Sequence, residues 1–125
     1  MLVFLERIKA SRQVPWDYDL YCIVENDLEV GRLVFRYGSD EQLKYCGHVG
    51  YHIDEEYRGH HYAYQALQDL FQIISLDEII LSCDLDNIAS QKTIEKCKIL
   101  EKKRVEEIDD PEYRDGLYIY RVKKS

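Results

Sequence analysis

The sequence predicts an α+β domain, or mixed α/β, in which strands predominate and two helices lie in the second half of the chain. Three observations predict this class. Apolar and polar residues alternate before residue 54, the period becomes that of a one-faced helix after His60, and a strand, a helix and another strand then follow in order. That step implies a locally parallel strand pair with a right-handed crossover. The expected order is β-β-β-β-α-β-α-β-β.

The length and net charge of the chain limit the number of domains and the classes of ligand that it can bind. A chain of 125 residues suits one domain, spanning 1–125, and 46% apolar residues suffice for a core without disulfide or metal staples. The net charge of −7 is opposite in sign to the broad positive field that a nucleic-acid or anionic membrane surface needs. Any anionic ligand must therefore be held by a local binding site rather than by the overall electrostatic field.

The cysteines and the start of the chain predict a cytoplasmic protein. Cys22, Cys46, Cys83 and Cys97 lie far apart, each in an apolar run, so we expect reduced, buried thiols rather than a zinc or redox pair. Charged residues interrupt the apolar start over 1–10, so we expect neither a signal peptide nor a membrane span.

The first half of the chain predicts four strands. Residues 2–9 could form the first. Tyr18–Glu25 and Glu29–Tyr37 form a hairpin about the turn Asn26-Asp27, because both are rich in aromatic and β-branched residues. A polar loop follows, and Tyr45–Ile53 is expected to be one further strand.

The second half predicts two helices and three strands. A helix runs from His60 to about Ile74, because apolar residues recur at one-faced helical spacing. Glu78–Cys83 is nearly all apolar and predicts a strand buried on both faces. A second helix is expected from Ile88 to about Cys97, followed by strands near Ile99–Glu107 and Leu117–Lys123.

The segment between the fourth strand and the first helix carries the strongest chemical signal. An acidic turn follows Ile53, and Arg58-Gly59 leads directly into the helix. The first amides of a helix lack intrahelical partners and carry the positive end of its dipole, so they can hold a pyrophosphate. Gly59 permits close approach and Arg58 adds charge. An ordinary capped helix start explains the same residues equally well.

This segment resembles the acyl-CoA pyrophosphate loop of the GNAT superfamily of N-acetyltransferases, whose signature is Gln/Arg-x-x-Gly-x-Gly/Ala. Arg58 matches the first position and Ala63 the last, whereas His61 stands where the family usually has glycine. We expect His61 to lie in the first turn of the helix. Glycine in its place would then lower the melting temperature through its poor helix propensity.

A second stretch resembles the same family. Asn87, Ser90, Glu95 and Lys96 match its Asn-x-x-Ser-(x4)-Glu-Lys pattern and follow a buried strand in the right order. Ile94 stands where many members carry a tyrosine that protonates the departing thiolate. The resemblance covers roughly residues 18–120.

The resemblance implies a fold and an activity. The fold would be a GNAT-like central mixed sheet of about six to seven strands, with a splayed strand pair and two main helices. The activity would be transfer of an acetyl group from acetyl-CoA, as cosubstrate, to a primary amine of a small molecule or peptide by direct attack. A catalytically silent acyl-CoA-binding or interaction module of the same fold is the alternative, and a purely structural adaptor is a weaker one.

The resemblance also implies binding roles. Backbone groups of Tyr51 and Ile53 would pair with the acetyl carbonyl and the pantetheine arm. Asn87 and Ser90 would line the cofactor channel, although Asn87 can equally be a helix N-cap with Ser90 as its N3 neighbour. The pyrophosphate would be held by the loop and first turn: Arg58, Gly59, His60, His61, Tyr62 and Ala63.

The candidate bases lie at the end of the fourth strand and directly after it. His52, Asp54 and Glu55 are possible bases, directly or through a water, and Ser90, one of the tyrosines or a water is a possible proton donor to sulfur. Each is also explained as a solvated loop or strand-edge residue. No metal site is expected, because His48 and His52 would lie ~13 Å apart along a strand.

The stretch from residue 10 to 17 is too short for the one or two helices that larger family members place after the first strand. The acceptor site should therefore be open, either to a bulky acceptor or to completion by a second subunit in a homodimer.

Overall fold

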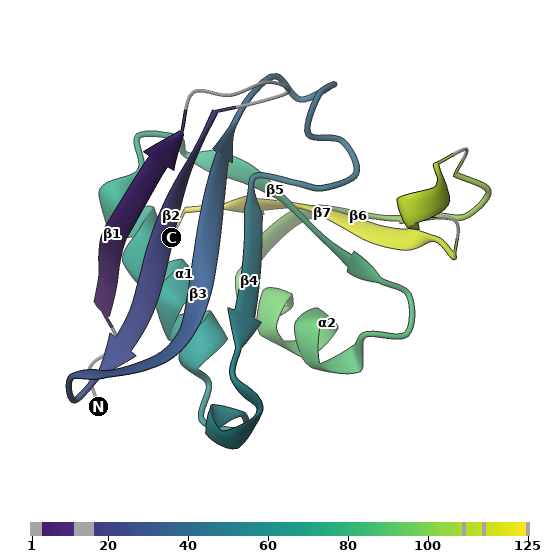
Figure 1. Cartoon of the computed structure of the whole chain (residues 1–125). Helices are drawn as coiled ribbons and strands as arrows, with labels where there is room; N and C mark the ends of the chain where they lie inside the picture. Colours follow the sequence, from purple (N-terminus) through teal and green to yellow (C-terminus); the bar gives the residue numbers. More distant parts are fainter. Residues whose placement is uncertain (1–3, 12–16, 109, 114, 125) are drawn as a thin grey trace.

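The computed structural model describes residues 4–11, 17–108, 110–113 and 115–124, and places them in one α+β domain (Figure 1). Seven strands and two α-helices occur in these ranges, with two short 3₁₀ turns at Glu55–Tyr57 and Pro111–Tyr113. The elements are β1 (Phe4–Ser11), β2 (Asp17–Glu25), β3 (Leu28–Tyr37), β4 (Val49–Ile53), α1 (Tyr62–Ile73), β5 (Glu78–Asp84), α2 (Ile88–Ile94), β6 (Lys98–Val105) and β7 (Leu117–Lys123). The predicted class and element order are confirmed.

The strands form two antiparallel sheets, ordered β1-β2-β3-β4 and β5-β7-β6. Figure 1 shows the sheets diverging from the end where β4 and β5 begin, with α1 behind the first sheet and α2 beside β5. The splayed pair is thus confirmed. The single mixed sheet with a parallel pair is not found in the described ranges: every strand ladder is antiparallel, and β4 and β5 diverge so far that they belong to separate sheets. No helix in the described ranges is long and apolar enough to cross a bilayer.

The core lies between α1 and the inner faces of both sheets. Ala66, Leu67 and Leu70 of α1 are fully buried, as helical spacing predicts. In β3, Leu33 and Phe35 are buried while Arg32 is exposed, which is the alternation of a strand with one buried face.

Two predicted boundaries are wrong. The strand expected over Tyr45–Ile53 begins only at Val49, because the Gly47 amide donates to the Leu43 carbonyl in a turn and Gly47 adopts φ +71°. The second helix ends at Ile94 rather than near Cys97. Cys97 N–H donates to the Ile94 carbonyl, three residues back, which closes a tight final turn.

The expectation of four buried thiols is only partly correct. All four cysteines are free, but only Cys83 is fully buried, and Cys22, Cys46 and Cys97 are half-buried. Burial raises the pKa of the Cys83 thiol to about 11, so it stays protonated and poorly nucleophilic at neutral pH.

The two sheets are joined by hydrogen bonds between His48 and Ile80. The His48 amide donates to the Ile80 carbonyl at 2.8 Å, and the Ile80 amide donates to His48 Nδ1 at 2.9 Å. His48 is buried, and this burial lowers the pKa of its imidazole, so the ring stays neutral. A side chain at Gly47 would meet the Ile80 carbonyl oxygen at 2.7 Å, so this approach requires glycine.

Replacing His48 by leucine is expected to destabilise the domain by about 1 to 3 kcal/mol, because the buried Ile80 amide loses its acceptor. His48→Asn, which keeps a short acceptor, should cost less. Thermal denaturation at pH 7 measures both variants.

The neutral imidazole stabilises the fold above about pH 6.5, and this contribution is lost as the pH falls. The melting temperature of His48→Leu should therefore fall less between pH 7 and 5 than that of the wild type. An equal fall in melting temperature in the wild type and in His48→Leu would contradict this role.

Candidate functional site

A groove of about 520 Å³ lies between the end of β4, the start of α1 and one face of α2. Its lining comes from two stretches that are distant in the sequence, 51–63 and 87–96: Tyr51, His52, Ile53, Tyr57, Arg58, Gly59, His61, Tyr62, Ala63, Asn87, Ala89, Ser90, Lys92, Thr93 and Lys96. The structure therefore brings together the two segments that the sequence singled out separately.

The open edge of β4 forms one wall of the groove. The Arg36 amide donates to the His48 carbonyl, and the Asp54 amide donates to the Val30 carbonyl, so these even-numbered positions face β3. Hydrogen-bonded pairs alternate along an antiparallel ladder. The backbone groups of Tyr51 and Ile53 therefore point away from β3, toward an edge that β5 leaves free. Such an edge can accept an extended chain as an added strand.

The start of α1 forms the second wall. Gly59 adopts φ +89°, and the N-cap residue, His61, adopts φ +63° and makes no side-chain cap hydrogen bond. The amides of the first turn thus receive no capping side chain from His61, and they carry the positive end of the helix dipole. Arg58 Nε donates to the Ile53 carbonyl at 2.9 Å and so fixes the loop against β4.

The expectation for His61 is wrong in one respect. His61 is the N-cap, outside the first turn, and it holds a left-handed conformation that glycine adopts without cost. Helix propensity therefore does not govern this position. The Lys96 ammonium lies 2.6 Å from His61 Nδ1, so the ring joins the start of α1 to the far end of α2.

The groove carries a local positive charge in an acidic protein. Arg58, Lys92 and Lys96 line it, and no aspartate or glutamate is among its lining residues in the described part of the chain. Lys92 and Lys96 were not predicted from the sequence as site residues. Lys92 lies three residues after Ala89 on α2, a helical spacing that was a signal in the sequence, whereas Lys96 lies in the turn after the helix.

Two hydroxyls meet inside the groove. Tyr51 Oη and Ser90 Oγ lie 2.7 Å apart, and burial raises the pKa of the Tyr51 phenol. Asn87 Oδ1 accepts a hydrogen bond from the Ser90 amide at 3.1 Å, so Asn87 is the N-cap of α2, as the alternative interpretation held. Asn87 also lines the groove, so the two interpretations are compatible.

The remaining candidates differ in their placement. His52 lines the groove, and its Nε2 lies 3.8 Å from Asp54 Oδ1. Asp54, Glu55 and His60 are not among the lining residues, and His60 instead packs near the Tyr62 ring. Within the described residues, no group of three or more histidine, cysteine, aspartate or glutamate side chains is placed to hold a metal ion.

A free strand edge, an uncapped helix start and a cationic groove form a site whose chemistry suits an extended, anionic ligand. The chain belongs to the acetyltransferase (GNAT) domain family, whose model matches residues 3–99. The comparison with curated proteins found no match to this sequence.

Solved structures share the fold. RimL, a ribosomal L7/L12 α-N-protein acetyltransferase in complex with coenzyme A, is 18% identical, with TM-score 0.64 over 85% of this chain and 62% of that one. The microcin C7 self-immunity acetyltransferase MccE, in complex with acetyl-CoA and AMP, is 17% identical, with TM-score 0.68 over 85% and 61%. An acetyl transferase from Salmonella typhimurium is 18% identical, with TM-score 0.65 over 91% and 67%. The chain thus spans about three fifths of the length of the first of these relatives.

His61→Gly is expected to raise the melting temperature by roughly 2 to 4 °C. A non-glycine residue in the left-handed region costs about 1 to 2 kcal/mol, which exceeds the extra unfolded-state entropy of glycine. Thermal denaturation measures the change. His60→Gly is the matched control, because His60 is equally exposed and has no positive φ, and it should give no gain. A lower melting temperature for His61→Gly would restore the helix-propensity explanation.

Proposed function

We propose that this domain binds acetyl-CoA in the groove and transfers its acetyl group to a primary amine. The observation that carries the proposal is the convergence, in a protein of net charge −7, of Arg58, Lys92 and Lys96 on a groove that joins a free strand edge to a helix start. That arrangement matches the chemistry of the cofactor, which has an amide-rich arm and a highly charged phosphate end.

Each part of the groove has a proposed role. The backbone groups of Tyr51 and Ile53 pair with the pantetheine amides and the acetyl carbonyl. The amides of residues 59–63 hold the pyrophosphate, with Arg58 supplying charge beside them. Asn87 and Ser90 line the channel. Lys92 and Lys96, which lie on the same face, attract the phosphate end of the cofactor.

The proposed chemistry is direct attack of the amine on the thioester carbonyl. A base first removes a proton from the ammonium, an amide donor stabilises the oxyanion, and the thiolate leaves with a proton. His52 is the base that the geometry favours, because it lines the groove, with Asp54 beside it. Glu55 is a weaker candidate, since it is not among the lining residues. Ser90, hydrogen-bonded to the Tyr51 phenol, is the proposed proton donor.

The acceptor side is proposed to be open. β1 ends at Ser11 and β2 begins at Asp17, so only five residues, which lie outside the described part, connect them. We propose that a small-molecule or peptide amine binds there, or that a second subunit completes the site. The Salmonella typhimurium neighbour modifies the N-terminal serine of the 50S ribosomal subunit protein L7/L12, which supports a peptide amine as acceptor. The four free cysteines support a cytoplasmic location.

One observation favours a second function, that of a catalytically silent acyl-CoA-binding module. Ile94 stands where many family members carry the tyrosine that protonates sulfur, and its side chain is only 1% exposed. An apolar, buried side chain cannot donate a proton. Binding and catalysis therefore need separate tests.

CoA is expected to bind with a Kd in the micromolar range (~10⁻⁶ to 10⁻⁴ M), because several charge-assisted contacts act together. Arg58→Ala and Lys96→Ala should each weaken binding about tenfold, and added salt should weaken it further. Isothermal titration measures the affinities. Lys103→Ala is the matched control, because Lys103 is an exposed β6 residue that pairs with Glu101 outside the groove. Absence of binding at millimolar CoA would overturn the proposal.

Turnover is expected when acetyl-CoA is supplied with a panel of primary amines and peptides, and release of the free thiol measures it. His52→Gln should lower kcat by roughly 10²-fold or more, the usual contribution of a general base, with little change in CoA affinity. CoA binding without thiol release for any amine would support the silent module instead. Activity that His52→Gln leaves unchanged would exclude His52 as the base.

A further inference from the structure

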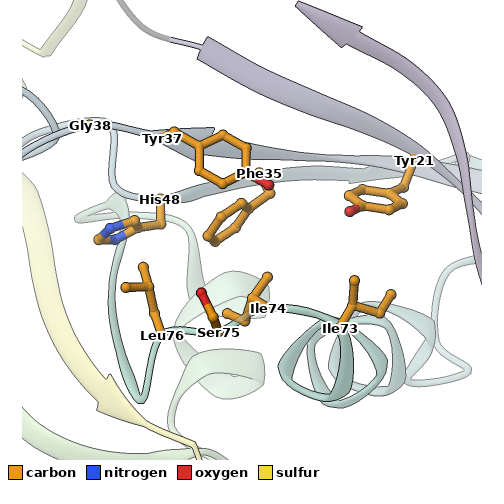
Figure 2. Close-up of a pocket in the computed structure, with 9 residues that line it drawn as sticks. All are labelled: Tyr21, Phe35, Tyr37, Gly38, His48, Ile73, Ile74, Ser75 and Leu76. Atoms are coloured by element: carbon orange, nitrogen blue, oxygen red, sulfur yellow. The ribbon is translucent and has the colours of Figure 1, made fainter.

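A second cavity, of about 330 Å³, lies at the opposite end of α1 from the groove. The 12 residues of α1 separate the two by ~18 Å at 1.5 Å per residue. Figure 2 shows the cavity between two layers: sheet side chains on one side, and the end of α1 with the turn after it on the other. Its lining is Tyr21, Phe35, Tyr37, Gly38, His48, Ile73, Ile74, Ser75 and Leu76. The proposed function does not use this cavity.

The lining selects an uncharged ligand. None of the residues that line the cavity is an aspartate, glutamate, lysine or arginine. Phe35 and Ile74 are buried and supply apolar contact. In Figure 2 the hydroxyls of Tyr21 and Ser75 point toward the space between the two layers. A charged molecule would lose its hydration here and find no ionic partner among the lining residues, while the charges that act on His48, those of Asp40 and Arg121, already pair with each other at 3.0 Å.

His48 supplies a directional polar group. Its Nδ1 accepts the Ile80 amide, so the neutral ring carries its proton at Nε2. His48 is only 4% exposed, and within the described part of the chain Nε2 has no hydrogen-bond partner. Nε2 keeps some accessible surface, so a ligand in the cavity can bring an acceptor oxygen to this donor.

The mouth of the cavity is apolar. Ile73, Tyr37 and Leu76 are 53%, 42% and 42% exposed, and all three line the same cavity. Single exposed apolar residues are normal, but several around one concave site indicate a binding surface. The same ring of residues gives a ligand apolar contact on the side that faces solvent.

We propose that this cavity binds a neutral, planar, mainly apolar small molecule whose carbonyl oxygen accepts a hydrogen bond from His48 Nε2. The volume lies at the small end of the range for ligand pockets, about 300 to 1,000 Å³. One aromatic ring with a short carbonyl substituent fits this size. The ring lies against Phe35 and between the side chains of Ile73 and Leu76.

Two probes test the hydrogen bond, acetophenone and ethylbenzene, which differ only in the carbonyl oxygen. Titration of the full chain, followed by ¹H–¹⁵N NMR, should give saturable shifts at the amides of Gly38, Ser75 and Leu76 and at His48 Nε2. Acetophenone should bind about fivefold more tightly than ethylbenzene, the effect of one added hydrogen bond. Equal affinities would overturn the role of His48, and no saturable shift with either probe would overturn the site.

Ile73→Lys places a charge at the mouth of the cavity. The substitution is in the last turn of α1, where a cation is favoured, so the fold is retained. It should weaken acetophenone binding at least about tenfold. Gln72→Lys is the matched control, because Gln72 is exposed on the same turn but does not line the cavity. Unchanged affinity in Ile73→Lys would overturn the proposal.

The test is independent of the cofactor groove. CoA affinity should be the same in Ile73→Lys, Gln72→Lys and wild type, so loss of acetophenone binding with intact CoA binding concerns this cavity alone. Sedimentation velocity distinguishes the other occupant of an apolar mouth, a second copy of the chain. A dimer that Ile73→Lys dissociates, and that excludes acetophenone, would overturn the small-molecule proposal.

Discussion

The hydrogen bonds between His48 and Ile80 are the constraint on which the shape of the site depends. They hold β4 and β5 together at one end, while β5 takes β7 as its ladder partner and leaves β4 with a free edge. Gly47 allows the close approach, and Arg36 Nη1 holds this segment by donating to the carbonyls of Cys46 and Gly47. The groove exists because the two strands meet once and then diverge.

Local pattern was sufficient to predict most of the fold. The alternation in β3 and the one-faced period of α1 both reflect burial of one side of an element, which neighbours in the sequence encode directly. The pyrophosphate loop was also predictable, because a strand end, Arg58-Gly59 and a helix start follow one another in the chain. The strand boundary at Val49 was not. Tyr45 and Cys46 favour a strand locally, but the turn closed by Gly47 is set by packing against β5, which lies more than thirty residues away.

The charge of the site, like the strand boundary at Val49, depends on residues that are brought together only by the fold. Net charge alone predicts that an anionic cofactor is repelled, and the only cation assigned from the sequence was Arg58. Lys92 and Lys96 become relevant because α2 and the turn after it place them on the groove together with the start of α1. At short range, three cations that line one groove act on an anion more strongly than the net charge of the whole protein, which salt screens.

Binding and chemistry place different demands on this fold. The strand edge and the helix start offer backbone groups, which any sequence that keeps the two elements can provide. His61 shows this, since it replaces a usual glycine and still adopts the left-handed conformation that the loop requires. A proton donor, in contrast, needs a particular side chain at a particular place. Ile94 is buried in the core and cannot donate a proton. The hydroxyl pair of Tyr51 and Ser90 joins β4 to α2 across the same groove. Tyr57, Tyr62 and Thr93 bring further hydroxyls to its lining, so a proton donor for this groove has candidates outside the position of Ile94.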